Sequence, residues 1–271
     1  MTSEPAESVP DARYSVHSLE LGLRILESFD RDAVDEMSLS EMARRIGVSR
    51  SSAFRLVHTL QRLGYLERED ETKNYRLGAR VMSLGYSFLA SKDIAELARP
   101  DLQRLRTATR CSTHLGILDG AEVIYIARFA AHTPVSAMIA VGARVPAHAT
   151  TMGRIILAHK PAAYIKEHFG SRPLAKFSEH TPVTLEALSA VLEADRHRGY
   201  VISHSNFEAG VASIAAPLFD SKGEVIGAIN VSTPENAIEL ERFDGEVCDA
   251  LRAAARRISE LSGYREAAFA S

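Results

Sequence analysis

The sequence is poor in cysteine and contains no long apolar run. Its two cysteines, Cys111 and Cys248, lie far apart and lack the spacing of metal ligands, so they favour a reducing compartment and indicate neither a disulfide framework nor a zinc site. No run of 18 apolar residues occurs, which argues against a membrane-spanning helix. Residues 1–11 carry three acidic groups and no apolar segment, unlike a secretory signal. We therefore expect a cytoplasmic protein.

An excess of charge of one sign is also absent. The 271 residues include 32 Lys and Arg against 35 Asp and Glu, a net charge of −3. The global charge gives no hint of nucleic-acid binding, although a large second domain can dilute a local basic surface. Hydrophobic residues make up 46% of the chain, which is ordinary for a globular protein, and the length suffices for two domains.

Recognisable catalytic motifs are missing as well. The sequence has no Gly-x-Ser-x-Gly elbow, no His-Glu-x-x-His, no phosphate-binding glycine-rich loop and no Cys/His cluster. We therefore expect no catalytic residue, no cofactor and no metal ion. The alternative is a hydrolase-like enzyme that uses Cys111 or a Ser/His pair, and loss of turnover in Cys111→Ala would support it.

Residues 38–64 have the pattern of a helix-turn-helix. Ser38 and Glu41 have the spacing of a capping box, in which each side chain satisfies the other's free backbone N–H. Gly47 can adopt the left-handed conformation that ends the first helix, and Ser49 can cap the second. Helical spacing predicts the buried faces: Leu39, Met42, Ala43 and Ile46 on the first helix, and Ala53, Leu56, Val57 and Leu60 on the second.

The flanking segments extend this element into a winged helix-turn-helix. Upstream, residues 16–29 predict a helix. Its apolar stripe is formed by Val16, Leu19, Leu23, Leu26 and partly Ile25. Downstream, the extended runs 65–68 and 74–77 are joined by a polar stretch and predict a hairpin in the position of a wing. An ordinary helix pair with a solvated basic face is the alternative, which the wing and the preceding helix disfavour.

The second helix of this element is suited to DNA. Between Arg44 and Leu66 there are five arginines and no acidic residue. Recognition helices meet base edges with their N-terminal residues, and arginine fits both guanine edges and phosphates. The predicted DNA-binding residues are Ser49, Arg50, Ser51, Ser52, Arg55, Arg45 and Lys73. The expected partner is double-stranded DNA.

After about residue 100 the pattern changes. Paired strands are predicted at 112–118 with 123–129 and at 211–219 with 225–232. Helical patterns occupy 81–98, with Pro100 near its end, and 152–168, 185–198 and 241–261. Strands paired by hairpins with helices between them indicate an α+β domain with a mainly antiparallel sheet. We expect a disordered tail at 1–12, the DNA-binding domain at 13–80, a linker helix at 81–99 and a second domain at 100–265.

The ordered set of motifs resembles the IclR family of bacterial regulators over about residues 14–262. The N-terminal segments that carry the resemblance are VHSLE (16–20), RILE (24–27), LSEMAR (39–44), GVSRSSAFRL (47–56), GYL (64–66) and YRLG (75–78). The C-terminal segments are PAHATTMGR (146–154), RGY (198–200), EAGVASIAAP (208–217) and AINVS (228–232).

The resemblance implies a winged helix-turn-helix, a linker helix used in dimerisation and a GAF-like effector-binding domain. Family members act as homodimers or tetramers, bind operator DNA and respond to small organic acids or related metabolites. Within the family, the TMGR turn and the EAGVASIA segment are most similar to regulators of aromatic-acid catabolism, of the protocatechuate and hydroxybenzoate (β-ketoadipate pathway) types.

Effector contacts are also implied by the resemblance. By family position they fall on Thr151, Met152, Ser203, Ser213, Asn230 and Ser232. Ser203 stands where an acid is common and Asn230 where a serine is common, which leaves the effector open. His114, on the first strand of this domain, is a further candidate, and Arg128 could neutralise an acid. For each side chain, a hydrogen-bonded structural role is the alternative.

These expectations combine into one hypothesis: a DNA-binding transcription regulator, repressor or activator, whose operator affinity changes when a small organic acid binds the second domain. Binding linkage would act through the dimer or tetramer, by altering the spacing of two recognition helices. Besides the enzyme, another winged-helix class with a different sensor is an alternative, which the C-terminal motifs disfavour.

Overall fold

The computed structural model describes residues 15–29, 35–90, 93–131, 139–170, 173–205 and 207–265, with the side chains of 85–90 and 93 excepted. The chain divides into two compact units, 1–91 and 92–271. The tail expected at 1–12 lies outside the described residues. Among the described helices, none is long and apolar enough to cross a bilayer.

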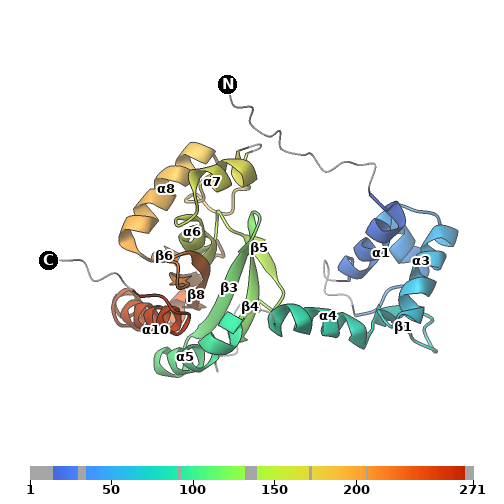
Figure 1. The fold of residues 1–271 in the computed structure, drawn as a ribbon, viewed down its shortest axis with the longest axis horizontal. Helices are drawn as coiled ribbons and strands as arrows, with labels where there is room; N and C mark the ends of the chain where they lie inside the picture. The colour runs from blue at the N-terminus through green and yellow to red at the C-terminus, as the bar shows by residue number, and fades with distance from the viewer. Residues whose placement is uncertain are drawn as a thin grey trace. The chain divides into compact units, whose positions relative to one another are not determined.

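The first unit is a helix-turn-helix followed by a two-stranded wing (Figure 1). Its elements are α1 (His17–Glu27), α2 (Leu39–Ile46), α3 (Arg50–Arg62), β1 (Leu66–Arg68), β2 (Tyr75–Leu77) and α4 (Ala79–Ala90). Strands β1 and β2 pair antiparallel, with Leu66 opposite Leu77. The winged helix-turn-helix predicted from the sequence is confirmed.

Local capping forms the turn between α2 and α3. The Ser38 hydroxyl accepts the Glu41 N–H at 3.2 Å, and the Ser49 hydroxyl accepts the Ser52 N–H at 3.2 Å. Gly47 has a φ of 74°, which an L side chain adopts at a cost. The capping box is only half formed, because the Glu41 carboxylate binds Arg44 and Arg45 instead of the Ser38 backbone. These two hydrogen bonds lower the pKa of Glu41 to about 2.

Only part of the apolar stripe predicted for α1 lies in the core: Ile25 is fully buried and Leu26 packs against the core. Val16, Leu19 and Leu23 are 60%, 63% and 51% exposed. The core of this unit is formed by Leu21, Ile25, Phe29, Met37, Met42, Ile46, Val57, Leu66 and Tyr75. Two apolar faces therefore lie on one short helix, and only one is covered within the unit.

The single helix predicted at 81–98 is also wrong. The structure has two helices there, α4 and α5 (Asp93–Thr109), with residues 91 and 92 outside the described residues. Pro100 lies inside α5 and not near its end. Pro100 is the eighth residue of α5, beyond the first turn where a proline is tolerated most easily, and the periodicity alone could not separate one helix from two.

The second unit is built on a six-stranded antiparallel sheet with the order β5-β4-β3-β8-β7-β6 (Figure 1). The strands are β3 (Ser112–Asp119), β4 (Glu122–Phe129), β5 (Arg144–Pro146), β6 (Val201–His204), β7 (Val211–Phe219) and β8 (Val225–Pro234). The α+β class and the antiparallel sheet are confirmed. Strands far apart in the sequence become neighbours, because β3 pairs with β8.

Helices cover both faces of this sheet. They are α5, α6 (Thr151–Leu157), α7 (Ala162–Phe169), α8 (Leu185–Arg198), α9 (Leu240–Arg242) and α10 (Cys248–Leu261). A 3-10 turn (Glu235–Ala237) precedes α9, and a π turn (Phe243–Val247) joins α9 to α10. The Thr113 hydroxyl donates to the Leu102 carbonyl on α5. Successive strand residues point to opposite faces, so His114 faces the other side, where α6 packs on β7 and β8.

The helix predicted at 152–168 is two helices, because Pro161 caps the start of α7. Helix α8 matches its predicted range and ends at Gly199, with a φ of 76°. Arg154 on α6 makes two 2.8 Å hydrogen bonds to Asp195 on α8. The Asp195 side chain is 1% exposed, so this ion pair ties the two helices together inside the unit.

Candidate functional site

A groove crosses the first unit between α3 and the wing. Its volume is about 780 Å³. Its lining comes from the start of α2, the N-terminal half of α3 and both wing strands: Ser38, Leu39, Ser40, Arg50, Ser51, Phe54, Arg55, Arg68, Thr72, Lys73, Asn74 and Tyr75. Four of these residues are cationic and none is acidic. Such a surface favours a polyanion.

The predicted DNA-binding residues divide into two groups. Arg50, Ser51, Arg55 and Lys73 line the groove and are exposed. Lys73 is in the left-handed region at φ 60°, at the tip of the wing. The other three predicted residues, Ser49, Ser52 and Arg45, do not line it.

The three residues outside the groove make hydrogen bonds within the first unit. Ser49 caps α3, and its hydroxyl lies 3.0 Å from the hydroxyls of Ser51 and Ser52. Arg45 donates to the Ser28 carbonyl at 2.8 Å and to the Glu41 carboxylate at 2.8 Å, with its side chain 19% exposed. The prediction that Arg45 contacts DNA is therefore corrected: it ties α2 to the end of α1.

The sequence analysis missed several groove residues. Phe54 is 53% exposed on α3, and an exposed ring on a recognition helix can contact a thymine methyl group. Arg68 and Asn74 reach the groove from the wing. The signal for Phe54 was present, since it falls outside the predicted buried stripe of that helix.

The second unit contains a small cavity on the α6 face of the sheet. Its volume is about 50 Å³. Strands β3, β4, β6, β7 and β8, the start of α6 and two loops contribute its lining: His114, Tyr125, Ile139, Thr150, Thr151, Ser203, Phe207, Glu208, Val211, Ser213, Asn230 and Ser232. Six of the seven residues expected to contact an effector lie here.

A hydrogen-bonded chain connects four of these residues across four elements. The His114 Nδ1 lies 2.8 Å from the Asn230 Oδ1, and the Asn230 Nδ2 donates to the Ser213 hydroxyl at 3.1 Å. Ser213 and Thr151 hydroxyls are 2.9 Å apart. The register explains the convergence, because His114 is directly opposite Asn230 and Ser213 directly opposite Ser232.

Burial keeps the imidazole and the phenol of the cavity neutral. It lowers the pKa of His114 to about 4, opposed by the hydrogen bond that His114 makes to Asn230 and assisted by the nearby Arg128 guanidinium. Burial also raises the pKa of Tyr125, as does the Glu208 carboxylate. At neutral pH the cavity therefore presents an uncharged imidazole and an uncharged phenol.

Met152 does not line the cavity, so its predicted effector contact is corrected. It is fully buried in the core, where its side chain lies against Gly116. The sequence analysis also missed Tyr125, Ile139, Phe207, Glu208 and Val211. These residues lie on neighbouring strands or in loops, and no sequence pattern connects them to the polar groups.

Two further predictions concern residues around the cavity. The His148 Nε2 donates to the Ala175 carbonyl at 2.9 Å, and its ring packs against Phe169 and Phe177, so this histidine is held by its surroundings. Arg128 lies opposite His114 in the β3–β4 pairing. Its Nε is buried and has no hydrogen-bond partner among the described residues.

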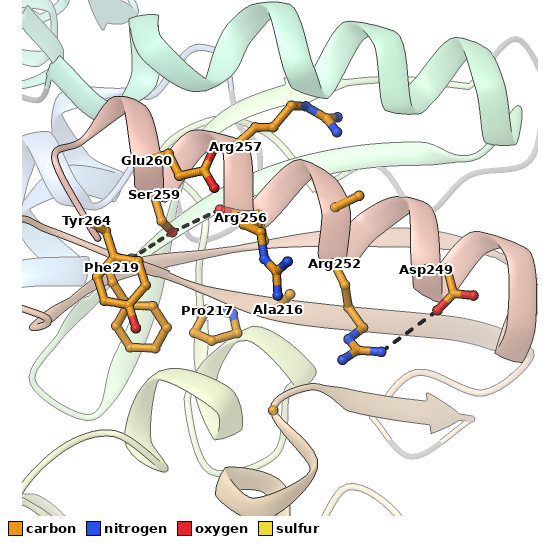
Figure 2. Close-up of a pocket in the computed structure, with 13 residues that line it drawn as sticks. Ala216, Pro217, Phe219, Asp249, Arg252, Arg256, Arg257, Ser259, Glu260 and Tyr264 are labelled. Carbon is orange, nitrogen blue, oxygen red and sulfur yellow. Dashed lines mark hydrogen bonds and ion pairs between the residues drawn. The ribbon is translucent and has the colours of Figure 1, made fainter. Parts of the chain in front are cut away.

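A larger cleft of about 590 Å³ lies between α10 and β7. Figure 2 shows Arg252 and Arg256 projecting from α10, with Arg256 on the side of the Phe219 and Tyr264 rings and Arg252 next to Asp249. Arg252 pairs with Asp249 at 3.8 Å, and Arg257 binds Asp101 at 2.8 Å. The buried Ser259 hydroxyl is satisfied by the Phe219 N–H and the Ala255 carbonyl.

Of these two hollows, the smaller cavity is the better ligand site. It is lined by His114, whose buried Nε2 has no hydrogen-bond partner among the described residues, and the larger cleft has no such atom in its lining. Cys111, the nucleophile of the alternative enzyme hypothesis, lines neither hollow. Burial raises the pKa of the Cys111 thiol, and a protonated thiol is a poor nucleophile. Among the described residues, no group of three or more His, Cys, Asp or Glu could hold a metal ion.

Comparisons with known families match both units. Residues 18–70 match the IclR helix-turn-helix domain, and residues 86–260 match the C-terminal domain of bacterial transcriptional regulator IclR. The chain is 31% identical over 252 residues to the HTH-type transcriptional regulator XynR of Escherichia coli (strain K12), covering 92% of this chain and 98% of that protein. It is also 31% identical over 240 residues to the Pca regulon regulatory protein of Pseudomonas putida, covering 88% and 81%.

Solved structures show the same architecture. An IclR homologue from Microbacterium hydrocarbonoxydans complexed with 4-hydroxybenzoate superimposes with a TM-score of 0.78 at 30% identity, covering 90% of this chain and 98% of that one. The IclR of Thermotoga maritima superimposes with a TM-score of 0.74 at 26% identity, covering 92% and 99%.

Proposed function

This chain belongs to the IclR family of transcriptional regulators, and on that premise we propose that its groove binds operator DNA under the control of an organic acid held in its cavity. An aromatic acid of a catabolic pathway is the favoured effector. The protein acts by binding and not by catalysis. The observation that carries the proposal is the pairing of an exposed cationic groove in one unit with a buried polar cavity in the other.

The groove supports DNA binding by its chemistry. Arg50 and Arg55 lie about one and a half turns apart on α3, in the half that enters the major groove in helix-turn-helix proteins. Arg68 and Lys73 on the wing are placed for the flanking phosphates, which supply affinity without sequence preference. Phe54 adds an apolar contact between the two arginines.

The cavity supports a small polar ligand, and the relatives favour an aromatic acid. The Pca regulator and the 4-hydroxybenzoate complex point to this class, and Arg128 provides a cation beside His114. A volume of about 50 Å³ is well below the roughly 300–1,000 Å³ of typical ligand pockets. Binding therefore requires lining side chains such as Ile139 and Phe207, which come from loops, to move outward.

The uncovered apolar face of the first unit supports a homodimer. Leu19 and Leu23 are four positions apart on α1, hence on one face of it, and both are more than half exposed, as are Met82 and Leu84 on α4. An exposed apolar face can mark an interaction surface. Dimerisation places two recognition helices about 34 Å apart on DNA. Sedimentation of Leu19→Glu checks this step, and an unchanged dimer fraction would contradict it.

DNA binding by the full-length protein tests the proposal. The probe is the DNA upstream of its own gene, an unrelated fragment of equal length is the competitor, and the dissociation constant is measured at two salt concentrations. We expect sequence-dependent binding that weakens steeply with salt. We also expect a change of several-fold when an effective aromatic acid is added, corresponding to a coupling of about 1–3 kcal/mol.

Two outcomes overturn different halves of the proposal. Binding that ignores sequence and salt removes the operator-binding role. Specific binding that no aromatic or aliphatic acid alters, together with no ligand-induced rise in melting temperature, removes the effector role. An Arg50→Ala variant is the control, because it weakens DNA binding and leaves the cavity untouched.

A further inference from the structure

The His114 imidazole is held at one nitrogen and unpaired at the other. Its ring is 2% exposed and packs edge-on against Tyr125, with ring centroids 5.4 Å apart. Nδ1 is bonded to Asn230, whereas Nε2 is buried without a partner among the described residues. Leaving a buried polar atom unpaired costs free energy, so Nε2 is a site that a ligand can satisfy.

The neighbouring amide determines which tautomer is present. The Asn230 Nδ2 is used as a donor to Ser213, and its Oδ1 faces His114. An amide oxygen only accepts, so the His114 Nδ1 carries the proton. The neutral ring then has a lone pair at Nε2, which can accept a hydrogen bond and cannot donate one.

The surrounding charges are consistent with this state. Arg128 lies opposite His114 on β4 and disfavours protonation of the ring. The Glu208 carboxylate, a second acceptor, lines the same cavity. A ligand therefore satisfies His114 Nε2 only if it presents a hydrogen-bond donor to it.

We propose that His114 selects the effector by accepting, at Nε2, a hydrogen bond from a hydroxyl group, so that the ligand is a hydroxy-substituted acid. The inference rests on the proposed function, because it assumes that this cavity holds the effector. A cation for the carboxylate of such an acid is Arg128, which is directly opposite His114 on β4 and whose buried Nε has no hydrogen-bond partner among the described residues. An acid without a hydroxyl leaves Nε2 unsatisfied.

Matched pairs of acids test the selection. Binding of 2-, 3- and 4-hydroxybenzoate to the full-length protein is compared by calorimetry with that of the corresponding fluorobenzoates, which are similar in size and cannot donate. We expect one hydroxybenzoate to bind about 10- to 100-fold more tightly than its fluoro partner, as for loss of a buried hydrogen bond.

Two histidine variants separate recognition from folding. In His114→Asn the new amide can still donate to Asn230, but it has no acceptor at the position of Nε2. The ratio of the affinities for the hydroxy acid and its fluoro partner should therefore fall to within about threefold. His159→Asn is the matched control. That histidine also has an unpaired, buried Nε2 and a pKa of about 4 but packs on Phe219, so this variant should keep the full preference.

A measurement on the unaltered protein does not depend on whether the variants fold. Nitrogen-15 spectra of labelled histidine, assigned through His114→Asn, report the tautomer directly. We expect Nδ1–H with an unprotonated Nε2 in the free protein, and a shift of the Nε2 signal when a hydroxybenzoate binds.

The outcomes are distinct. An Nε2–H tautomer, or hydroxyl and fluoro acids of equal affinity, overturns the role of His114 and leaves the proposed regulator intact. If no acid of the panel binds while specific DNA binding persists, the inference and the aromatic-acid effector fall together, and only the operator-binding half of the proposed function remains.

Discussion

The two units of this protein present their functional side chains in opposite ways. In the first, Arg50, Arg55 and Lys73 are exposed and charged, and all groove residues come from one stretch of 38 positions, 38–75. In the second, His114 and Asn230 are buried and uncharged, and 116 positions separate them.

The difference follows from the partners. DNA is a polyanion in water, so affinity comes from cations that keep their freedom at the surface. A small ligand is recognised inside a low-dielectric cavity, where one unmatched polar atom is costly and few groups suffice. Changes to buried groups should therefore affect stability, and changes to exposed ones should affect DNA binding.

The largest effect is expected from the buried ion pair between α6 and α8. Asp195→Ala leaves Arg154, whose side chain is 13% exposed, without its partner. Removing one member of a buried pair costs about 3–5 kcal/mol. Chemical denaturation should show a large loss for the second unit. Asp249→Ala, which breaks the exposed pair with Arg252, is the control, and equal losses in both variants would contradict the contrast between buried and exposed charges.

Acid should affect the two units in different ranges of pH. The pKa of His114 is lowered from 6.5 to about 4, so the folded state binds fewer protons than the unfolded state between these values. Stability of the second unit is then lost as pH falls from about 6.5 to about 4, by up to about 3 kcal/mol from this residue. His159 behaves in the same direction.

In the first unit the group with a lowered pKa is an acid and not a histidine. Glu41, with a pKa lowered from 4.5 to about 2, contributes stability that is present above pH 4.5 and lost toward pH 2. Unfolding followed at several pH values, with His114→Asn as comparison, checks the order. A first unit that loses stability before the second would refute it.

Loss of a groove arginine comes next in size. Arg50→Ala or Arg55→Ala should weaken operator binding by about 1–3 kcal/mol and relax the sequence preference, with little change in melting temperature. Arg62→Ala is the matched control, because Arg62 is an exposed arginine in the last turn of the same helix and does not line the groove. Comparable losses for all three arginines would mean that only net charge matters.

The smallest effect is expected from the helix cap. Ser49→Ala removes the acceptor of the Ser52 N–H and should cost about 1 kcal/mol of stability in the first unit, with a modest loss in DNA affinity because the start of α3 frays. Ser18→Ala, an exposed serine on α1, should cost less. Melting temperature and fluorescence anisotropy with labelled DNA measure the two effects, and an unchanged melting temperature for Ser49→Ala would rule out the capping role.

The errors of the sequence analysis share one physical origin: residue type and spacing do not specify which neighbours a side chain contacts in the folded chain. The stripe of Val16, Leu19 and Leu23 is truly apolar, but periodicity does not say which apolar face is covered within the chain. Arg45 is truly basic, yet the Ser28 carbonyl and Glu41 use its donors. Met152 occupies a family position beside the cavity, but its side chain turns into the core at Gly116.

The sequence by itself determined the elements whose forces are local. Their signals act over a few residues: a serine three positions before a free N–H, a glycine with a positive φ, and a basic segment without acids. The sequence therefore predicted the helix-turn-helix and its arginines. Only the tertiary structure decided the cavity. It placed β3 beside β8, and thereby His114 opposite Asn230. Strand register depends on pairing between distant segments, which no local pattern encodes.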